Sequence, residues 1–270
     1  MINLVAALMH EARPLIERYR MSSLKGGHPY PIFGNRQFTV IVSGIGKLAS
    51  AAAVGYLHAL TFKDGPSGWL NFGLAGHSDF DLGQGFTAHH VIDRGSGRSH
   101  YPLGLSAFPC PSSVLMTVDQ PERSYHAHGG YDMEASGFFR AALRASTIEL
   151  IHCYKVVSDN PRHPVKKMTK AAVTGFIGSR IEEMDTILSI LLESVAVHRK
   201  AHAPDCDLED ILKRWHFTET QSKQLTRLLQ RRRALYAKSA LPQLHLTDYP
   251  YAKDFLSALK QRLDAHRLKI

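Results

Sequence analysis

The chain has 270 residues, of which 44% are hydrophobic and 21% are charged, an ordinary balance for a soluble globular protein. This length suffices for one large domain, or for a domain with an appendage, so no disulfide or metal is needed to hold a core together. The formal net charge of +9, with 16 further histidines, favours anionic partners but does not locate them.

Three cysteines, Cys110, Cys153 and Cys206, are scattered and form no C-x-x-C pair. This pattern predicts reduced thiols in a cytoplasmic protein, with no disulfide framework and no metal site. The apolar residues 1–9 lack a basic leader and run directly into His10 and Glu11, unlike an export signal. Since no apolar stretch approaches the length of a membrane span, we expect no membrane anchor.

Strand-like and helix-like patterns alternate through the first two thirds of the chain. The expected strands are 2–8, 37–42, 68–72, 86–92, 114–118 and 153–157, and the expected helices are 11–20, 47–60 and 135–145. Apolar strands that alternate with helices indicate a sheet buried on both faces, hence an α/β sandwich.

The last third of the chain shows only helical patterns, over 181–198, 207–215, 218–238 and 251–268. Asp207 and Thr218 are good N-cap residues, and Gln221 stands three residues after Thr218, as in a capping box. Residues 199–206 have the composition of a connector. We therefore predict a domain over 1–198 and a helical C-terminal extension over 199–270.

Small residues and carboxylates follow several of the predicted strands. They are Glu11 after the first strand, Ser43, Gly44 and Gly46 after the second, Ala75 and Gly76 in a loop over 73–77, and Ser158 and Asp159 after the last strand. Ligands of open α/β sheets bind beyond the carboxyl ends of the strands. Glycines there permit close backbone approach, and carboxylates suit acid–base chemistry.

Each of these features also has a purely structural interpretation. Gly44 and Gly46 fit a tight turn between strand and helix, and Asp159 before Asn160 fits a turn. Glu11 fits the N-terminus of a helix, where a carboxylate interacts favourably with the helix dipole. The joint pattern, rather than any single residue, favours a functional site.

Five motifs in order carry a resemblance to a known family: Ala-Leu-Met-His-Glu11, Val-Ser-Gly-Ile-Gly-Lys47, Asn-Phe-Gly-Leu-Ala-Gly76, Asp-Met-Glu134-Ala-Ser and Val-Val-Ser-Asp159. Residues 1 to about 195 resemble the nucleoside phosphorylase/nucleosidase superfamily, and within it the methylthioadenosine/S-adenosylhomocysteine nucleosidases. The resemblance implies a three-layer α/β/α sandwich with a central mixed sheet. It also implies no metal or organic cofactor and a homodimer or larger homo-oligomer.

The resemblance further implies cleavage of the N-glycosidic bond of a purine nucleoside. Asp159 would be the general acid at N7 of the base, Glu134 would bind the ribose hydroxyls, Met133 would pack on the sugar, and Glu11 would activate water. The chemistry of this bond cleavage agrees with these roles, because the leaving base needs a proton and the ribosyl group gains positive charge. An acid whose pKa is raised by burial suits the first task.

The alternative nucleophile is phosphate, which would make the protein a phosphorylase. Arg13, Arg36, Arg94 and Arg98 are available as anion donors, but none matches a phosphorylase motif. We favour hydrolysis because a carboxylate at Glu11 would repel phosphate. A second alternative is a non-catalytic protein that binds nucleosides, or nucleic acid through the basic tail; nucleic acid is the less favoured partner, since Leu225, Leu228 and Leu229 indicate a packed helix.

The segment 119–130 occupies the place where the base would be recognised, and it departs from the family pattern. Gln120 is a candidate for reading the purine edge, whereas Tyr125 is interpreted as loop surface rather than a stacking residue. His77 replaces a small residue, which would let its loop contact a different substrate edge. Phe108 and His163 are further pocket candidates, and the expected substrate is an adenosine-type nucleoside with a modified 5′ group.

Overall fold

The computed structural model describes residues 1–61, 66–104, 108–125, 127–164, 168–202, 208–236 and 248–267. They form two compact units, Met1–Arg199 and Lys200–Ile270. The division falls near the end of helix α5 (Ile181–His202). Three of the predictions concern residues outside the described ranges: the thiol of Cys206, the N-cap at Asp207, and the helix ends at 238 and 268. Among the described residues, Cys110 and Cys153 are free thiols.

The first unit is built on a mixed sheet, as predicted. Its strands are β1 (Ile2–Ala6), β2 (Ser22–Ser23), β3 (Ile32–Gly34), β4 (Phe38–Val42), β5 (Gly68–His77), β6 (Gly85–Asp93), β7 (Ser99–His100), β8 (Ser112–Thr117), β9 (Gly130–Asp132) and β10 (Ile151–Asp159). Strand β5 pairs in parallel with β1 and β10 and antiparallel with β9. The strands β10, β6, β8, β9 and β5 form a closed ring of pairings, from which β1, β4, β3 and β2 extend.

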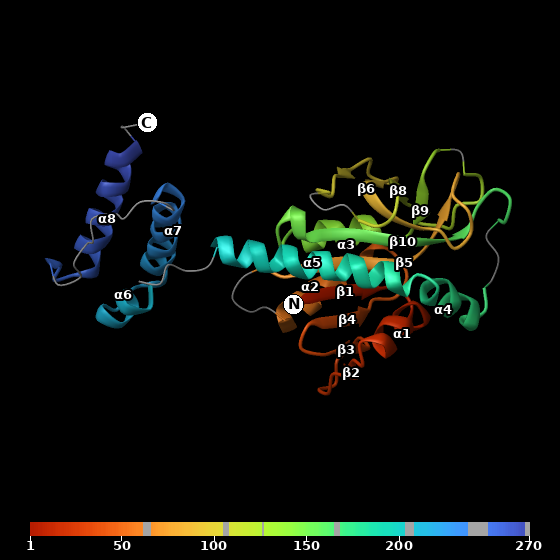
Figure 1. Cartoon of the computed structure of the whole chain (residues 1–270), viewed down its shortest axis with the longest axis horizontal. Helices are drawn as coiled ribbons and strands as arrows, with labels where there is room; N and C mark the ends of the chain where they lie inside the picture. Colours follow the sequence, from red (N-terminus) through yellow and green to blue (C-terminus); the bar gives the residue numbers. More distant parts are fainter. Residues whose placement is uncertain are drawn as a thin grey trace. The chain divides into compact units, whose positions relative to one another are not determined.

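Helices cover both faces of this sheet, which confirms the three-layer α/β/α fold. Alternate side chains of β1 point to opposite faces: Leu4 packs with α1 (Met9–Arg18), α4 (Lys170–Gly178) and α5, and Val5 packs with α2 (Lys47–Thr61) and α3 (Ala135–Ala142). The residues of β5 and β10 divide in the same way. Figure 1 shows α5 crossing one face of the sheet.

The loop predicted over residues 73–77 is wrong, because β5 continues to His77. Gly73 and Gly76 lie within the strand, where they let carboxylate side chains approach the backbone closely, and they do not form a turn. A Cβ atom on Gly73 would lie 2.6 Å from Glu11 Oε1, and one on Gly76 would lie 2.5 Å from Asp159 Oδ2. The strand therefore passes directly against two carboxylates of the expected site.

Other differences lie at element ends and in short elements. Strand β1 ends at Ala6 and α1 begins at Met9, so Glu11 stands in the first turn of the helix rather than at its first residue. Strands β2, β3, β7 and β9 and helix α4 were not predicted. Two or three residues cannot show a strand periodicity, and α4 has no strong apolar stripe.

The second unit contains three described helices, α6 (Leu208–Arg214), α7 (Glu219–Tyr236) and α8 (Ala252–Arg267). They share a small core that includes Leu225, Leu228 and Leu229, as the apolar spacing predicts. Thr218 and Gln221 exchange two backbone-to-side-chain hydrogen bonds of 3.0 and 3.3 Å, which confirms the capping box. None of the helices described in either unit is long and apolar enough to cross a membrane.

Gly137 in α3 lets two helices approach closely. A Cβ atom there would overlap the backbone carbonyl oxygen of Lys47, the first residue of α2. Backbone cannot yield as a flexible side chain does. The residue that precedes α2, Gly46, donates its amide to Glu134, so this contact also sets the position of a carboxylate of the site.

We expect Gly137→Ala to destabilise the protein by about 1–3 kcal/mol, the usual cost of overpacking a well-packed interior. Gly55→Ala is the matched control, because Gly55 lies in α2 with nothing within 4 Å of an added Cβ, and it should stabilise by about 0.4–1 kcal/mol. Urea unfolding of both variants measures the two changes. Equal stabilities of the two variants would contradict the close contact.

Candidate active site

A cavity of about 160 Å³ opens at the carboxyl ends of β1, β5 and β10. It brings together the three carboxylates that the sequence singled out, Glu11, Glu134 and Asp159. The residues that line it are Ala7, Leu8, Glu11, Ile45, Leu74, Ala75, Gly76, Val118, Pro121, Glu122, Tyr131, Asp132, Met133, Glu134, Ser158 and Asp159. Of the residues predicted to bind substrate, Met133, Ala75, Gly76 and Ser158 also line the cavity.

Glu11 is buried and held by two backbone amides. Its Oε2 accepts a hydrogen bond of 2.8 Å from Leu8 N, and its Oε1 accepts one of 2.9 Å from Leu74 N. Burial raises the pKa of the Glu11 carboxyl, and the Leu74 amide and the Lys155 ammonium oppose part of that rise. The hydrogen bond from Leu8 N stabilises the first turn of α1. Glu11 therefore has a structural place at the start of a helix and also lines the cavity.

Glu134 lies two residues after the end of β9, at the N-cap of α3. Its Oε1 accepts a hydrogen bond of 2.8 Å from Gly46 N. Burial first, and then the Asp132 carboxylate, raise the pKa of Glu134 to about 7 against the opposing charge of Lys155. This carboxyl group therefore changes its protonation state near neutral pH.

Lys155 forms a buried ion pair with Asp132, with Nζ 2.9 Å from Oδ2. This pair has no signal in the sequence, because a lysine within an apolar strand carries no motif of its own. Burial opposes the charged ammonium, but the carboxylates of Asp132 and Glu134 outweigh it and raise the pKa of Lys155. Asp132 also accepts hydrogen bonds from Thr117 Oγ1 and Ala135 N, both 2.8 Å, so its charge is satisfied.

Both carboxyl oxygens of Asp159 accept a hydrogen bond from a hydroxyl group. Ser158 Oγ donates to Oδ1 at 2.6 Å, and the Tyr125 hydroxyl donates to Oδ2. The interpretation of Tyr125 as loop surface is wrong, since this side chain is only 8% exposed. A tyrosine in a polar loop has no sequence signal for burial, and only its approach to Asp159 reveals it.

The turn between β4 and α2 makes hydrogen bonds to other groups of the protein. Gly44 and Gly46 have φ of +85° and +105°, which favour glycine. The amide of Gly46 is bound to Glu134, and Ser43 Oγ donates to the carbonyl oxygen of Gly44 at 2.8 Å. Ser43, Gly44 and Gly46 do not line the cavity, whereas Ile45 does. The amides of Gly44 and Gly46 are therefore bound within the protein, to Ala7 O and to Glu134, and the turn positions Glu134.

Three other candidates lie away from the cavity. Gln120 is exposed, and its neighbours Pro121 and Glu122 line the cavity instead. Phe108 lines a separate cavity together with His152 and Cys110. His163 forms a turn with Asn160, whose Oδ1 accepts a hydrogen bond of 2.9 Å from His163 N.

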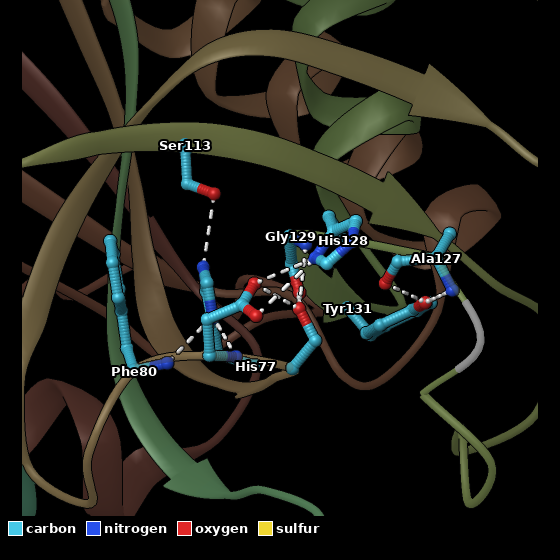
Figure 2. Close-up of polar contacts among 9 residues, drawn as sticks. His77, Phe80, Ser113, Ala127, His128, Gly129 and Tyr131 are labelled. Carbon is cyan, nitrogen blue, oxygen red and sulfur yellow. Dashed lines mark hydrogen bonds and ion pairs between the residues drawn. The ribbon is translucent and has the colours of Figure 1, made fainter.

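His77 is a buried structural residue at the end of β5 (Figure 2). Its Nδ1 accepts hydrogen bonds from the backbone amides of Asp79 and Phe80, at 3.0 and 3.1 Å, so Nε2 carries the proton and donates to Ser113 Oγ. The ring stacks on Phe80 at 3.9 Å between centroids. His77 is absent from the lining of the cavity, so the expected contact with a substrate edge is not made there.

The charges around the cavity are mainly negative. Five carboxylates line it, and none of the described lysines and arginines does. Arg94 forms an ion pair with Glu122 at the rim, and Lys47 is held between Asp93 and Asp119 at 3.2 and 2.9 Å. Among the described residues, no group of three or more histidine, cysteine or acidic side chains is arranged to hold a metal ion.

Comparison with solved structures shows the fold of the first unit. The chain is similar to the 5′-methylthioadenosine nucleosidase of Arabidopsis thaliana, with 14% identity, a TM-score of 0.57, and coverage of 70% of this chain and 95% of that one. For the methylthioadenosine/S-adenosylhomocysteine nucleosidase of Colwellia psychrerythraea bound to adenine, the values are 16%, 0.54, 72% and 95%. A futalosine hydrolase mutant of Helicobacter pylori gives 13%, 0.51, 70% and 98%.

No protein-family model matches the sequence, and neither does any curated protein. The structural likeness nevertheless confirms that the first unit has the nucleosidase fold that the five motifs predict.

Protonation of His77 should destabilise the fold. Burial lowers its pKa from 6.5 to about 4, with a small opposing effect of Asp79. The unfolded chain therefore binds more protons between these pH values, and stability is lost as pH falls from 6.5 toward 4, by up to about 3 kcal/mol. His77→Asn keeps an acceptor for the two amides but cannot titrate, so the slope of unfolding free energy against pH should become shallower.

His89→Asn is the matched control, because His89 is exposed, and its slope should equal that of the wild type. Urea unfolding at a series of pH values gives all three slopes. The same slope for His77→Asn and for the wild type would show that His77 does not cause the acid sensitivity.

Proposed function

We propose that the first unit, residues 1–198, cleaves the N-glycosidic bond of a purine nucleoside by hydrolysis. The observation that carries this proposal is the single cavity lined by Glu11, Glu134 and Asp159. The fold shared with purine nucleosidases supports it. The proposal includes a homo-oligomer in the cytoplasm, and it favours catalysis over a binding role because all three carboxylates reach the cavity.

Asp159 is the general acid in this proposal. The proton of its carboxyl group passes to N7 of the base as the bond between C1′ and N9 breaks, and the electron pair of that bond stays on the base. The hydroxyls of Ser158 and Tyr125 stabilise the carboxylate that forms, because hydrogen bonds to an ionised acceptor are stronger than those to a neutral one.

Glu134 binds the ribose hydroxyls through the oxygen lone pairs that Gly46 leaves open, and Met133 packs on the sugar. Glu11 takes a proton from the attacking water, whose oxygen bonds to C1′. A buried carboxyl group with a raised pKa is a better proton acceptor than an ordinary one. Leu8, Ile45 and Pro121 supply apolar surface for a 5′ substituent.

The charge of the cavity favours water over phosphate. A phosphate ion needs cationic or amide donors, but the Gly46 amide is bound to Glu134 and the charge of Lys47 is offset by two aspartates. An ionised Glu11 in the cavity lining would repel an anion. Hydrolysis is therefore the better supported of the two reactions, and the 5′-modified adenosines are the substrates to test first.

The purified protein should release adenine from 5′-methylthioadenosine in phosphate-free buffer, and Asp159→Asn should lower kcat by about 10²–10⁴-fold. Chromatography of the freed base measures both. Asp81→Asn is the control, since Asp81 is exposed and absent from the cavity lining. Turnover that requires phosphate and yields 5-methylthioribose 1-phosphate would establish the phosphorylase instead.

The raised pKa of Glu134 predicts a loss of activity in acid. Glu134 accepts the ribose hydroxyl hydrogen bonds as a carboxylate, so kcat/KM should fall as pH decreases below about 7, where this group becomes protonated. A profile of kcat/KM against pH for the wild type tests this. A flat profile down to pH 5 would mean that Glu134 stays ionised in the free protein.

A further inference from the structure

Tyr125 adopts a strained backbone conformation beside the acid. Its φ is +48°, in the left-handed region that a non-glycine residue adopts at a cost. Such conformations persist where the surrounding structure holds them, and they cluster at functional sites. In this conformation the phenol hydroxyl donates a hydrogen bond to Asp159 Oδ2.

Both sides of Tyr125 are fastened within its own loop. Before it, Glu122 Oε1 accepts the backbone amides of Arg123 and Ser124, at 2.9 and 2.7 Å. After it, the Tyr131 hydroxyl binds both backbone groups of Ala127, donating to the oxygen at 2.7 Å and accepting from the nitrogen at 2.9 Å (Figure 2). The Tyr131 ring also meets the Tyr125 ring edge to face, with centroids 5.9 Å apart.

The far end of the loop is fastened to the strand that forms the floor of the site. Gly129 N donates to Ser78 Oγ at 2.8 Å, and Ser78 N donates to the Gly129 oxygen at 3.0 Å. Ser78 follows directly after β5, which contains Gly76. These contacts attach the loop to the strand and set the position of Tyr125 relative to Asp159.

Gly76 leaves the space in which these two side chains meet. A Cβ atom at this position would lie 2.5 Å from Asp159 Oδ2 and 3.2 Å from Tyr125 Cε1. With Ser158 bound to the other carboxyl oxygen, rotation of the Asp159 carboxyl group would break one of two hydrogen bonds. The carboxyl plane is therefore fixed from both sides.

We propose that Tyr125 is a positioning residue for base protonation: its hydroxyl fixes the carboxyl group of Asp159 and stabilises the carboxylate that remains after the proton has passed to the base. This inference rests on the proposed function, in which Asp159 is the acid. Tyr125 itself transfers no proton in this step. Its hydrogen bond strengthens as negative charge forms on Asp159, so its effect appears only when the leaving group needs a proton.

The test compares two leaving groups in one variant. Tyr125→Phe keeps the ring and removes the hydroxyl, and it should lower kcat on 5′-methylthioadenosine by about 10- to 100-fold, the usual effect of a hydrogen bond to a charged group. On 4-nitrophenyl β-D-riboside, whose phenolate leaves without protonation, kcat should change less than about threefold, within the context-dependence of such contacts. The ratio of the two losses does not depend on how much of the variant is folded.

Tyr19→Phe is the matched control, because the Tyr19 hydroxyl also donates to a carboxylate, Asp185 Oδ1 at 2.6 Å, away from the cavity. It should leave both rates unchanged. In the Asp159→Asn background, Tyr125→Phe should lower kcat little further, since the two residues act on one step.

Three results would overturn the inference. Equal losses on both substrates would make Tyr125 a packing residue, and unchanged rates would make its hydroxyl irrelevant. If Tyr125→Phe lowered kcat as much in the Asp159→Asn background as in the wild type, the two residues would act on separate steps. If the wild-type protein cleaved neither compound, the proposed function would fall, and this inference with it.

Discussion

The buried ion pair between Lys155 and Asp132 joins the elements that make up the site. Lys155 lies on β10, four residues before Asp159, and Asp132 ends β9, two residues before Glu134. A buried cluster of carboxylates would repel itself strongly without a cation, and removing one partner of a buried pair leaves an uncompensated charge. Lys155 offsets part of the charge on Asp132, Glu134 and Glu11. The remaining effect of burial keeps the pKa of both glutamates raised, which makes Glu11 a better proton acceptor in the proposed chemistry.

Close backbone approach is the second requirement, and glycine meets it at three places. Gly73 and Gly76 bring β5 against Glu11 and Asp159, and Gly137 brings α3 against the start of α2. The same start of α2 presents the amide of Gly46 to Glu134. The site is therefore built by packing strands and helices closer than side chains would permit, with the carboxylates placed in the space that the glycines leave.

The sequence predicted the α/β sandwich, its main strands and the carboxylates at the cavity, because apolar periodicity and ordered motifs reflect local structure. It could not predict that β5 continues through residues 73–77, since glycines in a strand look like glycines in a turn. Nor could it separate Tyr125, which is buried, from Gln120, which is exposed, in one polar loop. Lys155 was missed for a related reason, because its partner lies 23 residues earlier in the chain and only the fold brings them together.

The closed ring of strands has a consequence for how the protein opens. Strand β5 shares hydrogen bonds with β1, β9 and β10, and β10 with β6, so the described strands around the site cannot peel away one at a time. Backbone amides in β5 must then exchange with solvent through a cooperative unfolding of several strands, and not through local fraying. The ring thus holds Gly73 and Gly76 of β5 in place against the carboxyl groups of Glu11 and Asp159.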